Sequence, residues 1–332
     1  MNYRRYKAHP TVDLPDRKWP AEKITKAPIW CSVDLRDGNQ ALEVPMTLEQ
    51  KVEFFQYLCS VGFKQIEIGF PAASDTDYNF CRYLIDNDLI PDDVAIQVLT
   101  QSRSHIIDKT MEAVKGAPSV IIHLYNATSV LHRDVVFGFS CDECINLAVE
   151  GAKMIIDRIN EDTSGTKFIL EYSPEAFSDT ELDFSVKICD SVLDCWKPTP
   201  ENKVIINLPE TVEYQTANVY ADQIEYFCRN TKWRDSIIVS LHTHNDRGTA
   251  VATSEFGLMA GGDRVEGTLF GNGERTGNVD LITLAINMLM TGVDPELDFS
   301  DMNNTIDLRS LFPEEIKEIL KENGIEAYRA GQ

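Results

Sequence analysis

"SIIVSLHTHNDRGTA", residues 236–250, joins an apolar run rich in β-branched residues to a polar cluster and then to a stretch with helical spacing. An apolar run of this length, bounded by polar turn residues, predicts a buried β-strand over 236–242. The spacing that follows predicts a helix over 247–261. The stretch therefore predicts one strand–helix unit whose polar residues fall where the strand ends.

The same unit recurs along the whole chain. Seven further apolar runs are each followed by a longer stretch with helical spacing. The predicted strands are 27–35, 64–70, 94–100, 119–125, 167–173, 203–209, 236–242 and 263–271. The predicted helices are 47–61, 75–88, 103–115, 141–161, 179–195, 217–230, 247–261 and 277–291. Strands that alternate with helices pair in parallel through right-handed crossovers.

Eight such units match the size of an α/β protein with a (β/α)8 TIM barrel. The alternative is an open doubly wound sheet, which favours a GxGxxG turn after an early strand. No predicted strand is followed by that motif. We therefore expect a TIM-barrel catalytic domain over 27–292, with an N-terminal arm over 1–26 and a short C-terminal helical extension over 293–332, whose helix starts at Pro313.

Composition limits the classes of partner. The chain has 332 residues, of which 43% are hydrophobic, and a formal net charge of −22. This charge argues against nucleic acid as a partner, because phosphate backbones are bound by Lys and Arg. No run of about 18 apolar residues occurs, which argues against a membrane partner. An anionic small ligand would need local arginines to overcome the overall field.

The eight cysteines do not form the spacing of a disulfide framework, and the N-terminus has no apolar stretch typical of a secretory signal. We therefore expect a reducing, cytoplasmic location. "CDEC" (141–144) has the CxxC spacing of a zinc site, but no second pair of matching spacing follows. We expect it to be the opening turn of a helix.

In a barrel of this kind, chemistry takes place where the strands end and the βα loops begin. Nearly every residue able to bind a ligand or transfer a proton, where it interrupts an apolar run, falls at such an end. These ends are residues 34–40, 67–77, 99–103, 123–129, 171–175, 207–213, 242–246 and 271–278.

His242 and His244 have a spacing that is typical of a metal site. Alternate residues of a strand face the same side, so the two imidazoles point together. Asp37, just past the first strand, is the best third ligand, because strands 1 and 8 close the barrel and strand 7 lies near. An Asp/His/His set with open positions suits a divalent cation that acts as a Lewis acid. The alternative is a pair of ordinary polar residues before a helix that Asn245 or Asp246 caps.

Three other features leave two interpretations open. "GNGERTGN" (271–278) is either a turn into the last helix or a cofactor-binding loop that offers backbone N–H groups, as at Gly273, and Arg275 to a phosphate. Glu67 is either an inward polar residue of a structural pair or a support for the site residues. His123 is either a core histidine or a site residue.

Nine motifs, in order from about residue 18 to 300, resemble the 2-isopropylmalate synthase family of the DRE-TIM metallolyase group. They are "APIWCSVDLRDGNQAL", "IEIGFPAASDTDYNF", "IQVLTQSR", "HLYNATS", "EYSPEAFSDTEL", "NLPETVE", "NVYADQIEY", "SLHTHNDRGTAVA" and "EGTLFGNGERTGNVDL". The resemblance implies a Claisen condensation of acetyl-CoA, as co-substrate, with the 2-oxo acid 2-oxoisovalerate. The products would be 2-isopropylmalate and CoA, in leucine biosynthesis.

The resemblance also assigns roles to residues. It implies Asp37, His242, His244 and Asn278 as ligands of a divalent metal, Mg²⁺ or Mn²⁺ with Zn²⁺ as a third option. Arg36 would stabilise the oxyanion that forms on the keto oxygen.

Further positions match the oxo-acid site of the family. Glu175, grouped with Arg36 as catalytic, and Thr211 match residues that contact the oxo acid. The remaining substrate-binding positions are Leu99, His123, Ser173 and Asn207.

Full-length members carry, after the barrel, a helical subdomain with an HPYGGD-like segment and then a leucine-binding regulatory domain. The similarity here fades after about residue 305, and no such motif occurs in the sequence. Two alternatives therefore stand beside the synthase, which we expect to be a homodimer. One is a metal-dependent C–C lyase or aldolase of the same group. The other is a truncated, partner-dependent or non-catalytic barrel that binds an oxo acid.

Overall fold

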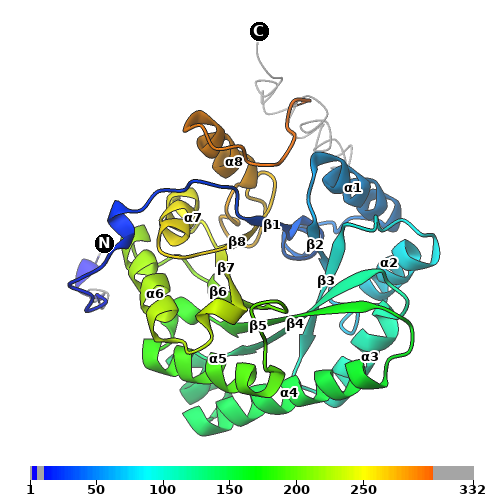
Figure 1. Ribbon diagram of the computed structural model, residues 1–332, viewed down its shortest axis with the longest axis horizontal. Helices are drawn as coiled ribbons and strands as arrows, with labels where there is room; N and C mark the ends of the chain where they lie inside the picture. The colour runs from blue at the N-terminus through cyan, green and yellow to red at the C-terminus, as the bar shows by residue number, and fades with distance from the viewer. Residues whose placement is uncertain (1, 6–10, 302–332) are drawn as a thin grey trace.

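The computed structural model describes residues 2–5 and 11–301. Within them, eight parallel strands close into one barrel in sequence order, surrounded by α-helices (Figure 1). The strands are β1 (Ile29–Ser32), β2 (Gln65–Gly69), β3 (Ala95–Gln101), β4 (Ser119–Ala127), β5 (Lys167–Glu175), β6 (Val204–Glu210), β7 (Ile237–Thr243) and β8 (Arg264–Gly267). The helices are α1 (Leu48–Val61), α2 (Asp75–Asp86), α3 (Ser104–Val114), α4 (Cys141–Glu161), α5 (Leu182–Trp196), α6 (Ala217–Asn230), α7 (Ala250–Met259) and α8 (Leu281–Met290). The predicted TIM barrel is confirmed.

Pairing between the first and last strands excludes the open sheet. Cys31 of β1 lies in register with Glu266 of β8, and Glu266 in turn lies in register with His242 of β7. The expected neighbourhood of strands 1, 7 and 8 is therefore present. It brings the end of β1 and the end of β7 to one side of the barrel mouth.

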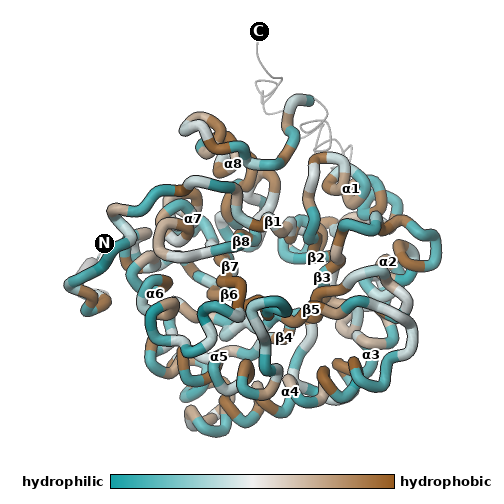
Figure 2. The backbone as a smooth tube through the Cα atoms, in the orientation of Figure 1, coloured by the Kyte–Doolittle hydropathy of each residue, from teal (hydrophilic) through white to brown (hydrophobic). Residues whose placement is uncertain are grey.

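Alternation with a period of two sorts the side chains of each strand between two environments. In β3, Ile96 and Val98 join the large apolar core, which packs between strands and helices. Ala95 instead joins a small apolar cluster with Ile121 and Ile205. Figure 2 shows the strands at the centre with apolar stretches, while the surrounding helices mix polar and apolar residues. Residues two positions further along each strand face the same side and lie closer to the barrel mouth.

Most predicted elements agree with the structure within a few residues, but strand 8 is shorter than expected. It ends at Gly267 and not at 271. Its neighbour β1 has only four residues, so no partner extends beyond that point. A side chain at Gly267 would lie 2.5 Å from Val279 Cγ1, because the returning segment before α8 packs directly on the strand end.

The helix α7 also starts later than predicted. Residues 245–248 form a turn in which Gly248, with φ of 78°, donates from its backbone N–H to the carbonyl of Asn245. The Asn245 side chain then accepts a hydrogen bond from the N–H of Ala250 at 3.2 Å. The turn is polar and helix-compatible in composition, so periodicity alone did not separate it from the helix.

The "CDEC" segment opens α4, as predicted. Ser140 caps the helix, and the Glu143 carboxylate accepts a hydrogen bond from the backbone N–H of Ser140 at 2.8 Å. The acidic residue between the cysteines therefore completes a capping box. Cys141 and Cys144 are free thiols, as are the other six cysteines of the chain.

The segments on either side of the barrel pack against it. Trp19 donates from Nε1 to Asp222 Oδ1 of α6 at 2.7 Å, and its ring lies 5.1 Å from that of Phe256 of α7. Trp30 Nε1 donates to the carbonyl of Pro295 at 2.8 Å. The predicted C-terminal helix falls beyond residue 301 and lies outside the described residues. In the described part, no helix has the length and apolar character needed to cross a membrane.

Candidate metal centre and active-site cavity

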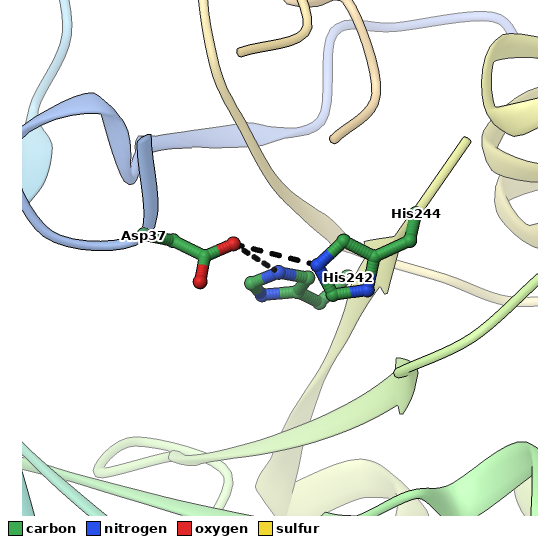
Figure 3. A group of neighbouring side chains, drawn as sticks. All are labelled: Asp37, His242 and His244. Carbon is green, nitrogen blue, oxygen red and sulfur yellow. Dashed lines mark hydrogen bonds and ion pairs between the residues drawn. The ribbon is translucent and has the colours of Figure 1, made fainter. Parts of the chain in front are cut away.

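Asp37, His242 and His244 meet at the carboxyl end of the barrel (Figure 3). Asp37 lies on a short helical turn, Asp34–Gly38, that follows β1, and the two histidines lie at the end of β7. Their three ligand atoms lie within 4.8 Å of one another, and all three residues are buried. Asp37 and His244 are 207 residues apart in the sequence, and the fold brings them to one point, as the sequence predicted.

Both imidazoles are held in the same way. Nδ1 of His242 bonds to Glu266 Oε2 at 2.7 Å, and Nδ1 of His244 bonds to the carbonyl of Glu210 at 3.1 Å. Nε2 of each ring then faces Asp37 Oδ2, at 3.5 Å and 3.4 Å. A metal-binding histidine almost always bonds to such a carboxylate or carbonyl through its other nitrogen. The geometry therefore presents two Nε2 atoms and one carboxylate oxygen to a common position.

Asn278 adds a fourth polar side chain to this group. Its segment forms a β-bridge with His244, and its Nδ2 lies 2.8 Å from Asp37 Oδ2. Its Oδ1 is buried and has no hydrogen-bond partner in the described residues. A side chain at Gly273 would lie 2.3 Å from Asn278 Nδ2, so the glycine leaves the space that this amide fills.

Arg36 ties this group to the interior of the barrel. Its Nη1 donates to Asp37 Oδ1 at 2.7 Å, and its Nη2 donates to Glu67 Oε2 at 3.0 Å. Burial opposes ionisation of Asp37, but the Arg36 guanidinium and hydrogen bonds from His242 and His244 hold the pKa of this carboxyl well below its ordinary value. The carboxylate is therefore an anion at neutral pH. Glu67 supports Arg36, in agreement with its interpretation as a supporting residue.

These four side chains fit a divalent cation. With a cation bound, two imidazole nitrogens, one carboxylate and one amide oxygen would form a mixed O/N ligand set with room for further ligands. The Oδ1 of Asn278 is buried and has no hydrogen-bond partner among the described residues, while Nδ2 is the amide atom that faces Asp37 Oδ2 in this structure. Burial opposes protonation of His242, yet the hydrogen bonds that its ring donates to the carboxylates of Asp37 and Glu266 raise its pKa to about 10, so a cation would replace a proton there.

A cavity of about 300 Å³ opens beside this group. Besides Asp37 and the two histidines, its lining includes seven of the residues that sequence patterns or the family resemblance singled out: Arg36, Leu99, His123, Ser173, Glu175, Asn207 and Thr211. Glu67 lies behind Arg36. The strand ends therefore converge on one space, as expected for this fold.

Glu175 lies at the end of β5, on the side of the cavity formed by β5 and β6. Burial raises the pKa of its carboxyl, against the effect of the positive charges of His132 and Arg36. The hydroxyl of Thr211 accepts a hydrogen bond from the N–H of Ala176 at 3.0 Å, which fixes the loop after β5 next to that after β6.

The floor of the cavity is a hydrogen-bonded set. His123 Nε2 and Ser173 Oγ lie 2.7 Å apart, and Asn207 Nδ2 donates to the same Ser173 oxygen at 2.9 Å. Leu99, one strand away, lies in register with His123. The side chains thus present one apolar and several small polar groups to a ligand.

Gly273 and Arg275 do not line this cavity. Arg275 donates from Nε to Asp246 Oδ1 at 2.6 Å and from Nη2 to the carbonyl of Thr211 at 2.7 Å. Its charge is therefore neutralised by a neighbour in this structure, and it joins the loop after β8 to those after β6 and β7.

A buried polar network beneath the cavity was not predicted from the sequence. Arg264 donates to Glu266 Oε1 and to Gln97 Oε1, both at 2.6 Å, and it lies 3.5 Å from Glu171 Oε2. Glu266 then reaches His242. Polar residues at alternating positions inside the apolar strands could have indicated this network. They were missed because only the strand ends were considered.

Five further residues line the cavity and were also missed. They are Gln40, Phe70, Tyr125, Pro209 and Glu274. Tyr125 and Pro209 each stand two positions after a predicted site residue of the same strand, so alternation could have found them. Gln40 and Glu274 lie on loops, where spacing gives no such guide.

The same segments of the chain match known proteins. A family model described as HMGL-like matches residues 27–308. The 2-isopropylmalate synthase of Acetoanaerobium sticklandii is 62% identical over 308 residues, which cover 93% of this chain and 54% of that protein. The 2-isopropylmalate synthase of Clostridium acetobutylicum is 57% identical over 309 residues, which cover 92% and 55%. The chain thus spans about half the length of the curated relatives it matches, and the resemblance found in the motifs is confirmed.

Solved structures show the same fold at low identity. The hydroxymethylglutaryl-CoA lyase of Pseudomonas aeruginosa superposes with a TM-score of 0.67 at 15% identity, over 86% of this chain and 92% of that one. The carboxyl transferase domain of Rhizobium etli pyruvate carboxylase gives 0.63 at 14%, over 86% and 47%. At these identities the likeness concerns the fold alone. Since the family model covers the barrel from before β1 to beyond α8, the chain belongs to the HMGL-like family.

Proposed function

We propose that this chain catalyses the condensation of acetyl-CoA with 2-oxoisovalerate to give 2-isopropylmalate and CoA. The observation that carries the proposal is the convergence of Asp37, His242, His244 and Asn278 at the edge of a small cavity that Arg36 also lines. The name of the relatives that are 57–62% identical supports the same reaction.

The site residues would hold Mg²⁺ or Mn²⁺, with Zn²⁺ as a third option. When bound, such a cation makes the carbonyl carbon of the oxo acid more electrophilic. The small polar set of His123, Ser173 and Asn207, with Leu99, would receive the branched side chain and orient the acid. Thr211 would hold its carboxylate end.

Arg36 would stabilise the negative charge that develops on the keto oxygen. Its Nη atoms are fixed by Asp37 and Glu67, so it needs little reorganisation during the reaction. Its Nε is buried and has no hydrogen-bond partner among the described residues, which leaves a donor for the substrate.

Glu175 would move the proton. A carboxylate whose pKa is raised by burial is a stronger base than one in water, and Glu175 is such a group on the cavity wall. The proton that leaves the acetyl methyl group would pass to a Glu175 oxygen, and the resulting carbon nucleophile would attack the keto carbon. The C=O π electrons would move to the keto oxygen, which would take up a proton to become the hydroxyl of the product. Water then cleaves the thioester and CoA leaves.

The experiment is a condensation assay read by mass spectrometry. Purified chain, Mg²⁺ or Mn²⁺, acetyl-CoA and 2-oxoisovalerate are expected to give 2-isopropylmalate. Asp37→Ala should abolish the product, because it removes a ligand and the partner of Arg36. Asp86→Ala, at an exposed position of α2, is the matched control and should retain activity. Absence of product from the unchanged chain, or an active Asp37→Ala, would refute the proposal.

The same assay separates the other reaction class, since a C–C lyase would instead cleave added 2-isopropylmalate without CoA.

We further propose a homodimer in the cytoplasm, with residues 27–292 as the catalytic domain between an arm (1–26) and an extension (293–332). Eight free thiols support a reducing compartment. The exposed apolar side chains of Leu289 and Met290 on α8 support contact with a second copy. Sedimentation of the purified chain at several concentrations tests the dimer.

A further inference from the structure

The two cysteines of "CDEC" lie in the first turn of α4. Cys141 is the first residue of the helix and Cys144 the fourth, after Ser140 as the cap. Residues three apart lie on one face of a helix, with Cα atoms about 5 Å from each other. A disulfide joins Cα atoms that are roughly 4.4–6.8 Å apart. The backbone of α4 therefore already holds the two residues at the separation that a disulfide needs.

The two thiols differ in how far a reagent can reach them. Cys141 is half-buried, whereas Cys144 is 1% exposed and belongs to the apolar core. Burial raises the pKa of the Cys144 thiol to about 11, and a negative charge on Cys141 adds to this effect, which places the two sulfurs near each other. A reagent therefore meets Cys141 first, and Cys144 remains behind it as a protonated thiol.

The buried sulfur contacts the end of β4. Cys144 Sγ accepts a hydrogen bond from Asn126 Nδ2 at 3.3 Å and donates one to the carbonyl of Ala127 at 3.6 Å. Arg133, on the short turn between β4 and α4, pairs with Glu181 and also acts by its positive charge on both thiols. A nearby cation favours the thiolate, which is the attacking form of a cysteine. The pair therefore combines an accessible sulfur, a buried second sulfur and a cation.

We propose that Cys141 and Cys144 are a redox-active dithiol, which a low-molecular-weight disulfide oxidises to an intramolecular disulfide. The Cys141 sulfur loses its proton and attacks one sulfur of the reagent, whose S–S bond breaks, and the first thiol of the reagent leaves with the electron pair and takes up a proton. The Cys144 sulfur then loses its proton and attacks the Cys141 sulfur, and the second thiol leaves in the same way. The chain loses two hydrogen atoms and is oxidised, while the reagent is reduced to two thiols.

Peptide mapping of the folded chain tests this site. The chain is incubated with glutathione disulfide, the reaction is stopped with acid, and the remaining thiols are alkylated with N-ethylmaleimide before digestion with trypsin. Trypsin releases residues 134–153 as one peptide, in which Cys141 and Cys144 are the only cysteines. Mass spectrometry of this peptide therefore reports on the pair alone.

The same digest contains a matched control. Residues 188–203 form one tryptic peptide with two cysteines, Cys189 and Cys195, both on α5. Cys189 is buried and Cys195 half-buried, as in the α4 pair. They are six residues apart in the helix, so their Cα atoms lie about 10 Å from each other, which is beyond the reach of a disulfide.

In the unchanged chain, the 134–153 peptide should lose two hydrogen atoms and carry no alkyl group, and dithiothreitol should restore both thiols. The 188–203 peptide should form no internal disulfide. In Cys144→Ser, Cys141 should retain one glutathione as a mixed disulfide, because no second sulfur displaces it. In Cys141→Ser, Cys144 should be alkylated and carry no glutathione. Thermal unfolding before the reaction establishes that each variant is folded.

Three results would overturn the proposal. One is a 134–153 peptide from the unchanged chain that keeps both thiols or ends as a mixed disulfide. Another is an internal disulfide in both peptides to the same extent, which would mean that the chain reacts through unfolding. The third is uptake of glutathione by Cys144 in Cys141→Ser and none by Cys141 in Cys144→Ser. Neither cysteine lines the active-site cavity, so the outcome does not depend on the proposed reaction.

Discussion

At the scale of single residues, two glutamates buried in the barrel interior differ in the direction in which their pKa values are shifted. Burial raises the pKa of both, but Arg264 and His242 outweigh it at Glu266 and hold the pKa of that carboxyl well below its ordinary value. At Glu171 burial dominates, and the negative charge of Glu266 adds to it, so the pKa lies well above the ordinary value. Glu266 is therefore the carboxylate that anchors His242, and Glu171 is a neutral acid.

This difference predicts unequal effects of the same substitution. Glu266→Gln removes the anion that holds His242 Nδ1, so metal affinity should fall by about 10–100-fold. Glu171→Gln replaces a neutral acid by a neutral amide and should change metal affinity less than about threefold. Calorimetric titration of Mn²⁺ measures both. Equal losses in the two variants would contradict the assignment of the charge to Glu266.

Glu210 predicts a pH dependence of stability. It is buried at the end of β6, and neither of its carboxyl oxygens has a hydrogen-bond partner within the described residues. Burial, with the nearby charges of Glu213 and Asp246, raises its pKa to about 9 from an ordinary value of 4.5. Between these two values the unfolded chain releases a proton that the folded chain retains, so stability falls as the pH rises.

Glu210→Gln imitates the protonated acid and should remove this loss. Near pH 5 the variant and the unchanged chain should have similar free energies of unfolding. At pH 8 the variant should be more stable by at least about 1 kcal/mol, since one pKa unit corresponds to ~1.4 kcal/mol. Urea denaturation at the two pH values measures the difference. A gap that is the same at both would show that Glu210 ionises normally in the folded state.

The sequence predicted the proximity of the candidate metal ligands better than the contacts of the groups behind them. His242 and His244 could be paired because alternation is a local rule, and Asp37 because strand order is a rule of the fold. The bond from Glu266 to His242 depends on how two strands align in register, which no local pattern states. For the same reason, the neutralisation of Arg275 by Asp246 could not be foreseen.

At the scale of elements, helix ends are where prediction was least accurate and where capping decides stability. The α4 helix started where expected because Ser140 and Glu143 form a capping box with a clear sequence signal. The side chain of the residue before α7 forms no capping hydrogen bond, and the predicted start of this helix was three residues too early. For β8, the end was set by packing of the returning segment on Gly267, which is a tertiary contact.

The capping box predicts a specific loss of stability. Ser140 Oγ accepts from the N–H of Glu143 at 3.3 Å, and Ser140→Ala removes this acceptor. The free energy of unfolding should fall by about 1 kcal/mol, within the usual range for a lost cap. Ser140→Thr keeps the hydroxyl and is the control, with a smaller change. Urea denaturation followed by circular dichroism measures both, and an unchanged Ser140→Ala would mean that Glu143 alone holds the helix start.

At the scale of the whole molecule, the candidate metal ligands join parts of the chain that meet only when the barrel closes. Asp37 follows β1, the histidines end β7, and Asn278 lies between β8 and α8. The unfolded chain cannot present these groups together. A cation bound by all of them would therefore stabilise the closed barrel by mass action, by about 2.7 kcal/mol at a concentration 100 times its Kd.

The unfolding temperature should accordingly rise with Mg²⁺ or Mn²⁺ concentration and continue to rise logarithmically above the Kd. His244→Gln should remove most of this rise, because it takes away one ligand on β7 and leaves the exposed surface unchanged. His105→Gln, at an exposed position of α3, is the control and should respond to the metal as the unchanged chain does. If His244→Gln gained as much stability from the metal as the control, the cation would be bound elsewhere, and the three strand ends would meet for packing alone.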